Sequence, residues 1–322
     1  MLPPARQRRS FVVAALFATS CGMAGLPALH CLGSKQTGAL YGPPAPACAA
    51  WFGADAAAAT AATTSTRFAV IGDYGDGGPN EMAVSALVKQ WKPAFILTTG
   101  DNNYPRGTAE TIDANIGAAY HDFIAPYLGR FGCGADRNRF FPSLGNHDWI
   151  ADDARPYLEY FQLPGNERYY DAVWGDVHFF AVDSDSREPD GIDVTSAQAR
   201  WLQQRLAAST ARWQVVYMHH PAYSSGPHGS ALRMRWPFKE WGADLVLSGH
   251  DHIYERLTVD GLTYVVDGLG GAAFYTLGPP LPESQVRFTD GAGALLIDAD
   301  ATTLHARFET VDGRVIDSWT LR

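Results

Sequence analysis

The chain has 322 residues, and 46% of them are hydrophobic, which is enough for one large core or two smaller ones. Acidic residues outnumber basic ones, 34 against 25, and the formal net charge is −9. This balance excludes a general nucleic-acid binder, because binding to the phosphate backbone needs a surplus of lysine and arginine.

The first 30 residues have the composition of an export signal. No acidic residue precedes Asp55, and RRSF (8–11) stands before the apolar run VVAALF (12–17). This pattern resembles a twin-arginine signal, and its apolar core is too short for a mature membrane span. We therefore expect export to the periplasm or the medium. An organelle lumen, an uncleaved anchor, or lipidation at Cys21 within an imperfect lipobox are the alternatives.

Residues 31–66 are rich in Ala, Gly, Pro and Thr and lack periodicity, which is typical of a linker. The folded domain is expected at 67–322. No later stretch reaches the roughly 20 apolar residues of a spanning helix, so we expect no stable membrane association once the leader is removed. Only Cys133 of the four cysteines falls in the domain, and a disulfide framework is not expected.

Strand and helix patterns alternate along the domain. Helices are expected at 81–91, 109–129 and 196–208, the last capped by Thr195. The pieces 169–183 and 262–271, with a hairpin at 303–321, predict a second, more antiparallel sheet. The predicted fold is α/β, with two facing mixed sheets flanked by helices. Five apolar runs predict the other strands: RFAVIGDYG (67–75), AFILTTGDNNY (94–104), FFPSLGNHD (140–148), WQVVYMHHP (213–221) and ADLVLSGHDH (243–252).

Each of these five runs ends in side chains that can bind metal ions. Loops at the carboxyl ends of strands converge on one edge in α/β folds, so residues distant in sequence can meet there. The set has oxygen and imidazole donors and no thiolate, which favours iron, manganese or zinc over an iron–sulfur cluster. One carboxylate can also bridge two ions. The candidates are Asp73, Asp101, Asn146, His219, His250 and His252, with Tyr104 nearby.

Five motifs in this order resemble the five blocks of the calcineurin-like metallophosphoesterases: GDYG (72–75), GDNNY (100–104), GNHD (145–148), MHHP (218–221) and GHDH (249–252). The tyrosine of the second motif is typical of purple acid phosphatases. The short chain is similar to their small animal and bacterial forms, which include the tartrate-resistant enzymes. The resemblance covers residues 67–256 and implies the four-layer β-sandwich of that superfamily.

The resemblance also implies two metal positions. The first would hold iron(III), whose charge transfer with a tyrosinate colours these enzymes, through Asp73, Asp101, Tyr104 and His252. Asp101 would bridge to a second ion, which would be iron(II), zinc or manganese. Its other ligands would be Asn146, His219 and His250, since the family pattern His-x-Pro selects His219 rather than His220.

The implied reaction is hydrolysis of phosphate monoesters by in-line attack of a metal-bound hydroxide, as in an acid phosphatase. The substrate would be a small phosphorylated molecule contacted by Asn146, His147 and His228. The two histidines would contact the ester or protonate the leaving group. His228 is placed by PHG (227–229), which matches the family segment only loosely.

Other interpretations remain open. A phosphodiesterase or nucleotide hydrolase could use the same site, and a non-catalytic scaffold could share the fold, although scaffolds typically lose ligands. We expect His121, His178 and His305 to lie outside the site. The acidic run of Asp183, Asp185 and Glu188 is interpreted as a solvated loop and not as a metal site.

Overall fold

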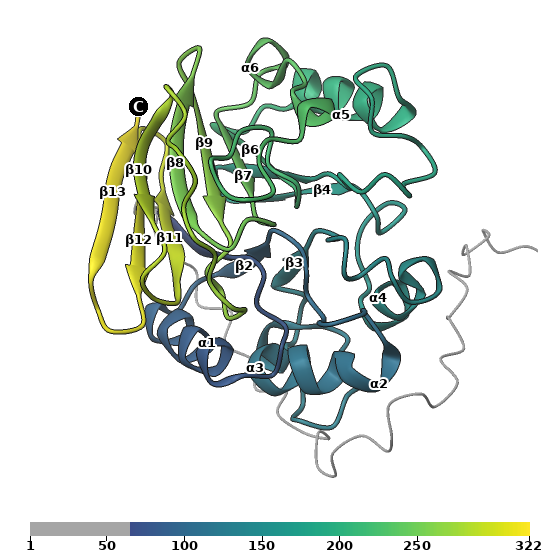
Figure 1. Ribbon diagram of the computed structural model, residues 1–322. Coiled ribbons are helices and arrows are strands. Elements are labelled where there is room, and N and C mark those ends of the chain that lie inside the picture. The colour runs from purple at the N-terminus through teal and green to yellow at the C-terminus, as the bar shows by residue number, and fades with distance from the viewer. Residues whose placement is uncertain (1–64) are drawn as a thin grey trace, which may run out of the picture. The chain divides into compact units, whose positions relative to one another are not determined.

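The computed structural model describes residues 65–322. The predicted leader at 1–30, Cys21 and all but the last two residues of the predicted linker lie outside the described residues, and the domain boundary at 67 stays a prediction. Two sheets dominate the described part (Figure 1). No helix within residues 65–322 is long and apolar enough to cross a membrane.

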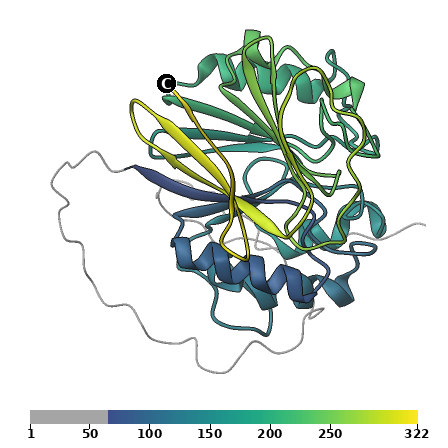
Figure 2. The ribbon, with the colours of Figure 1, turned by 60° about the vertical axis from the view of Figure 1, so that its left-hand side comes forward.

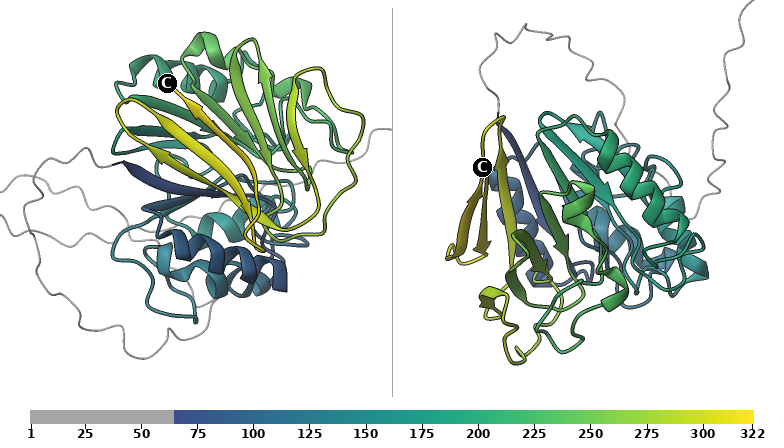
Figure 3. Two further views of the ribbon diagram at one scale, coloured as in Figure 1. Left: turned by 90° about the vertical axis from the view of Figure 1, so that its left-hand side faces the viewer. Right: turned by 90° about the horizontal axis from the view of Figure 1, so that it is seen from above.

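Sheet A has six strands in the order β13-β12-β11-β1-β2-β3. β1, β2 and β3 are parallel to one another, and β11 pairs antiparallel with β1. The C-terminal hairpin β12–β13 therefore lies at the outer edge of this sheet (Figure 3). The strands are β1 (Thr66–Ile71), β2 (Phe95–Thr98), β3 (Phe140–Pro142), β11 (Gly293–Ala299), β12 (Leu304–Thr310) and β13 (Val315–Leu321).

Sheet B has seven strands in the order β10-β8-β9-β7-β6-β5-β4. Its centre, β5-β6-β7-β9, is parallel, and the strands outside it are antiparallel. The strands are β4 (Tyr170–Trp174), β5 (Val177–Ala181), β6 (Trp213–Tyr217), β7 (Leu245–Ser248), β8 (Tyr254–Val259), β9 (Leu262–Asp267) and β10 (Ser284–Phe288).

Helices cover the outer faces of the two sheets, so that four layers are stacked (Figure 2). The helices α1 to α4 lie on the side of sheet A, and α5 and α6 lie on the side of sheet B. They are α1 (Pro79–Trp91), α2 (Ala109–Ile112), α3 (Ala118–Tyr120), α4 (Arg155–Tyr160), α5 (Ala197–Ala208) and α6 (Phe238–Trp241). Short π or 3₁₀ turns lie at η1 (Asp113–Gly117), η2 (His121–Phe123), η3 (Asp152–Ala154) and η4 (Leu232–Met234).

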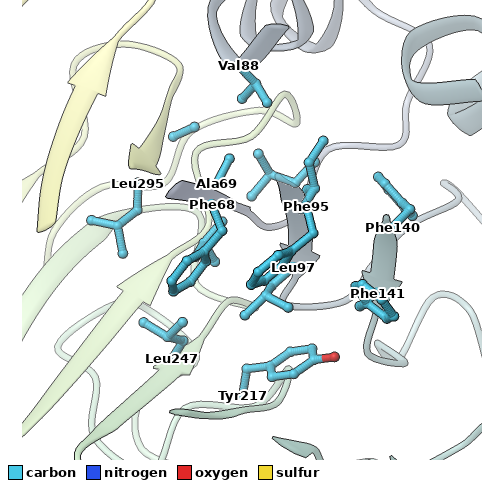
Figure 4. Close-up of a cluster of buried hydrophobic side chains, with 14 of the residues drawn as sticks. Phe68, Ala69, Val88, Phe95, Leu97, Phe140, Phe141, Tyr217, Leu247 and Leu295 are labelled. Carbon is cyan, nitrogen blue, oxygen red and sulfur yellow. The ribbon is translucent and has the colours of Figure 1, made fainter. Parts of the chain in front are cut away.

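The main hydrophobic core lies between the sheets. Phe95 of sheet A stacks on Phe68 at 4.8 Å between ring centroids and contacts Phe179 of sheet B at 4.9 Å. In Figure 4, Phe68 points toward sheet B, whereas its neighbour Ala69 points toward Val88 of α1. Both faces of β1 are thus buried from Phe68 to Ile71, which explains the apolar run FAVI. A separate cluster packs α5 and α6 on the other face of sheet B.

The predicted fold class is confirmed, but the assignment of strands to sheets was wrong. The five motif strands do not form one sheet, because β1, β2 and β3 belong to sheet A and β6 and β7 to sheet B. The segments 169–183 and 262–271 join sheet B, while the 303–321 hairpin joins sheet A. Local patterns identify strands, but they do not specify which strands pair across long sequence separations.

Three local predictions differ in detail. The helix expected at 109–129 ends at Phe123, because Ile124 is extended and Pro126 disfavours a helical Ala125. The cap of α5 is Ser196, whose hydroxyl accepts a hydrogen bond from the Ala199 N–H, and not Thr195. Cys133 is disulfide-bonded, which the cysteine spacing did not predict.

Glu81, in the first turn of α1, generates a prediction about stability. Its side chain is fully buried, one oxygen accepts a hydrogen bond from the Gly77 N–H, and the other has no hydrogen-bond partner among residues 65–322. Burial raises the pKa of Glu81 to about 9. The folded chain therefore keeps this carboxyl neutral, while the unfolded chain ionises it near its ordinary value of about 4.3. The contribution of Glu81 to the free energy of unfolding is therefore fully present below the pKa of the unfolded chain and is lost as pH rises toward 9.

Glu81→Gln keeps an acceptor for Gly77 and cannot ionise. Its free energy of unfolding should equal that of the wild type near pH 4 and exceed it increasingly at higher pH. The gain should reach up to about 1.4 kcal/mol for each pH unit. Urea unfolding between pH 4 and 9 measures this difference, with exposed Glu240→Gln as the control that stays flat. A constant difference for Glu81→Gln would contradict the burial argument.

Candidate metal centre

The carboxyl ends of β1, β2, β3, β6 and β7 carry the predicted site residues. Asp73 follows β1, and Asp101 and Tyr104 follow β2, all in sheet A. His219 follows β6 of sheet B in the same way. Asn146 lies beyond β3, and His250 and His252 lie beyond β7. The two sheets therefore bring all seven predicted donors to one place.

The first group of donors is centred on the Tyr104 hydroxyl. Its oxygen lies 3.2 Å from Asp73 Oδ1, 3.1 Å from Asp101 Oδ2 and 3.1 Å from His252 Nε2. His252 Nε2 is also 3.4 Å from Asp73 Oδ1. Four candidate donor atoms from three loops thus converge on a space the size of one metal ion.

The second group is centred on His219 Nε2. This nitrogen lies 3.0 Å from Asn146 Oδ1, 3.1 Å from His250 Nδ1 and 3.3 Å from Asp101 Oδ2. Asp101 Oδ2 therefore belongs to both groups. Its other oxygen, Oδ1, accepts the backbone N–H of His147 at 2.9 Å, which fixes the orientation of the carboxylate.

Backbone carbonyls orient two of the histidines. His219 Nδ1 lies 2.8 Å from the Thr99 carbonyl, and His252 Nδ1 lies 2.6 Å from the Ala273 carbonyl. A carbonyl only accepts, so Nδ1 must carry a proton, and Nε2 is the nitrogen that faces the site and binds a metal ion when it is unprotonated. This arrangement is typical of metal-binding histidines.

Glycines of the motifs permit the close approach of these loops. A Cβ atom at Gly145 would lie 2.2 Å from Asp101 Oδ1, and one at Gly249 would lie 2.4 Å from Asp73 Oδ2. Asp73, Asp101 and His250 themselves have positive φ angles of 54°, 52° and 71°. Non-glycine residues in this region are strained, and such strain concentrates at functional sites. Steric crowding thus explains why a glycine precedes the donor in the Gly-Asp, Gly-Asn and Gly-His pairs of the motifs.

The electrostatics of the site fit bound cations. Asp73 and Asp101 are buried, and no lysine or arginine of the described residues forms an ion pair with either. Burial would lower the pKa of His219, but the Asp101 carboxylate outweighs it and raises that pKa to about 10. Burial, followed by the Asp73 and Asp101 carboxylates, raises the pKa of Tyr104 well above its usual value. Only a cation would make Tyr104 an anionic ligand here.

The two histidines predicted to contact the substrate lie beside different donors of this centre. His147 Nδ1 is 2.6 Å from the Pro105 carbonyl, and its ring lies 4.6 Å from that of Tyr104. His228 is exposed, and its ring lies 4.4 Å from the ring of His250. Both predicted histidines are therefore beside the donors, although their roles stay predictions.

Two supporting residues, Asp148 and Asp251, were missed. Buried Asp148, the last residue of GNHD, accepts hydrogen bonds from the Gly145 N–H and from the backbone and side chain of Asn102. It thereby ties the second motif to the third. Asp251, inside GHDH, accepts from Ser224 and from the backbone N–H of His228. Both aspartates belong to the quoted motifs, which was the available signal. Only the metal ligands of those motifs were interpreted from the sequence, and these two residues were given no role.

Two other expectations have different outcomes. His178 is buried and bonded to Asp171 at 2.7 Å, away from the donors, as expected. The interpretation of Asp183, Asp185 and Glu188 as a solvated loop was wrong, because all three are buried. Buried carboxylates need partners, and here arginines and hydrogen-bond donors supply them.

His220 also lies close to the second group. The donor atoms of His219, His220 and His250 lie within 4.8 Å of one another, as do those of Asp73, Asp101 and His219. The ring of His220 is 4.4 Å from that of His250, and its Nδ1 bonds to the Ser184 hydroxyl at 3.0 Å.

Sequence comparisons identify related proteins. The profile described as "Calcineurin-like phosphoesterase" matches residues 66–254. Purple acid phosphatase 17 of Arabidopsis thaliana is 25% identical over 300 residues, which cover 79% of this chain and 84% of that protein. Tartrate-resistant acid phosphatase type 5 of Mus musculus is 26% identical over 250 residues, or 66% of this chain and 74% of that protein.

Structural comparisons give two neighbours with the same fold. Purple acid phosphatase PPD1 from yellow lupin seeds has a TM-score of 0.64 at 17% identity, covering 80% of this chain and 54% of that chain. GAP50, described as the anchor in the inner membrane complex of Plasmodium, also has a TM-score of 0.64, at 18% identity, covering 80% and 89%. At such identities the likeness shows the fold alone.

Proposed function

The chain belongs to the calcineurin-like phosphoesterase family, and we propose that it is a metal-dependent phosphatase that hydrolyses phosphate monoesters. The observation that carries this proposal is the position of Asp101 Oδ2, which lies 3.1 Å from the Tyr104 hydroxyl and 3.3 Å from His219 Nε2. One carboxylate oxygen thus joins two complete groups of donors. This is the arrangement that a two-metal hydrolase needs.

The donor sets suggest different ions for the two positions. Asp73, Asp101 and Tyr104 offer three oxygens that can be anionic, which suits iron(III). Asn146, His219 and His250 offer a neutral oxygen and two nitrogens, which suits iron(II), zinc or manganese. When bound, two such ions would activate water for in-line attack and neutralise the charge of the phosphoryl oxygens.

The surrounding residues orient the donors and handle protons. The His147 N–H holds Asp101 Oδ1, so that Oδ2 stays between the two groups. His147 Nδ1–H donates to the Pro105 carbonyl, and Nε2 can therefore deliver a proton only from a protonated ring. His228, exposed beside His250, is the second candidate for the leaving group.

The substrate class can be tested with two esters that share one leaving group. Purified protein of known metal content is assayed with 4-nitrophenyl phosphate and bis(4-nitrophenyl) phosphate from acid to alkaline pH. We expect kcat/KM to be higher for the monoester by at least about tenfold in acid, together with two bound ions for each chain. A higher kcat/KM for the diester would instead indicate a phosphodiesterase or nucleotide hydrolase on the same donors.

Iron at the first position is tested by Tyr104→Phe. The iron-loaded wild type should absorb visible light through the tyrosinate, and the variant should lose this band because it lacks the phenol oxygen. Tyr275→Phe is the matched control, since Tyr275 stacks on His252 at 4.1 Å but lies outside the donor set. A band that survives in Tyr104→Phe would rule out this tyrosine as the iron ligand.

A non-catalytic scaffold is the second candidate function. The GAP50 neighbour, named an anchor, has a TM-score equal to that of the lupin phosphatase, so the fold does not discriminate between them. The donors favour the enzyme. All seven predicted ligand positions hold a metal-binding residue, whereas a scaffold has no need to keep them.

We further propose that the chain is exported, on the evidence of the leader sequence. Twin-arginine translocation requires the arginine pair in RRSF (8–11). Changing Arg8 and Arg9 together to Lys keeps the charge of the leader but should abolish export, measured by fractionation of cells. Undiminished export would exclude this route. Small phosphorylated molecules, and not nucleic acids, are the proposed partners.

A further inference from the structure

The segment Asp183–Arg187 follows β5 and reaches the candidate metal centre. β5 is the parallel neighbour of β6, which carries His219, so both strands end at the same edge of sheet B. Asp183, Ser184 and Asp185 are buried. We call these five residues the post-β5 segment.

Helix α5 fixes the start of this segment. Gln198 is fully buried, its side-chain oxygen accepts the Asp183 N–H at 2.7 Å, and its amide donates to the Asp183 carbonyl at 2.9 Å. The Asp183 carboxylate in turn accepts the Trp149 indole N–H at 2.9 Å and the Asp185 N–H at 2.9 Å. A rigid element thus supports the segment, which in turn contacts the loop beyond β3.

Arg187 links the segment to Asn146. Asp185 holds the guanidinium at both ends, at 2.7 Å to Nε and 2.8 Å to Nη2. The same Nη2 donates to the backbone carbonyl of Asn146 at 2.9 Å. Because an arginine held by a bidentate carboxylate is rigid, it fixes the backbone from which the Asn146 side chain projects.

Ser184 links the segment to the loop of His219. Its hydroxyl accepts the backbone N–H of His220 at 2.8 Å and contacts His220 Nδ1 at 3.0 Å. Both contacts fall on the residue directly after His219. The segment therefore supports two loops that supply donors of the second group, and none of its hydrogen bonds within residues 65–322 reaches Asp73, Tyr104 or His252.

We propose that Arg187 and Ser184 are positioning residues that set the affinity of the second metal position and leave the first unchanged. This inference rests on the proposed two-metal function. Outer partners of metal ligands typically change metal affinity by about 10- to 100-fold when they are removed. Because Arg187 and Ser184 contact only loops of the second group, we expect the whole loss of metal affinity to fall on the ion at the second position.

The test compares Arg187→Gln and Ser184→Ala with a matched control, Arg205→Gln. Arg205 makes the same kind of two-point pair with Asp171, at 3.0 and 2.6 Å, but contacts none of the predicted donors. Metal-free protein is titrated with Zn²⁺ in competition with a chromophoric chelator, which gives the two stepwise affinities. A parallel titration with Co²⁺ records the absorption of each position, and urea unfolding of the metal-free variants measures their stability.

We expect both variants to bind one ion as tightly as the wild type and the second about 10- to 100-fold more weakly. Arg205→Gln should keep both affinities. Unchanged binding of both ions by the variants, or an equal loss of affinity at both positions, would overturn this inference. The proposed function would still stand in that case, provided that the wild type binds two ions. Fewer than two ions in the wild type would overturn the proposed function itself, and this inference with it.

Discussion

Asp73 and Asp101 are buried where the two sheets meet, and no lysine or arginine of the described residues compensates them. An isolated buried carboxylate is strongly unfavourable in a protein interior. Among residues 65–322, only histidines form ion pairs with these two, and the Asp101 carboxylate raises the pKa of His219 to about 10. The buried carboxylates thus favour a bound cation, and the surrounding architecture holds further donors around that position.

This constraint explains features that look unrelated in the sequence. The loops must approach within contact distance, so Gly145 and Gly249 precede donors where any Cβ would collide with a carboxylate. The backbone must turn sharply, so Asp73 and Asp101 take positive φ angles. The strained loops need fixed partners, and buried Asp148 supplies one of them by joining the Asn102 and Gly145 loops.

Much of the fold and of the candidate site was predictable from the sequence, and the predictions that were wrong have a physical reason. Strands, ligand candidates and the facing sheets follow from local patterns, because alternation, apolar runs and Gly-Asp turns are local in sequence. The distribution of strands between the two sheets was not predictable from local patterns, since β1 pairs with β11 more than 200 residues away. The burial of Asp183 was missed for the same reason, because its partners Trp149 and Gln198 are supplied by other elements.

Protons and metal ions compete for the same donor atoms in both groups of this centre. With no cation bound, the raised pKa of His219, about 10, means that a proton occupies the second group at neutral pH. A metal ion must displace it, so the hold of the second group on a divalent ion weakens as pH falls. Tyr104, whose pKa is raised by burial and by the Asp73 and Asp101 carboxylates, must likewise lose its proton before it can bind a cation in the first group. The contacts that hold the loops of Asn146 and His219 therefore bear directly on how well the second group competes with protons for a divalent ion.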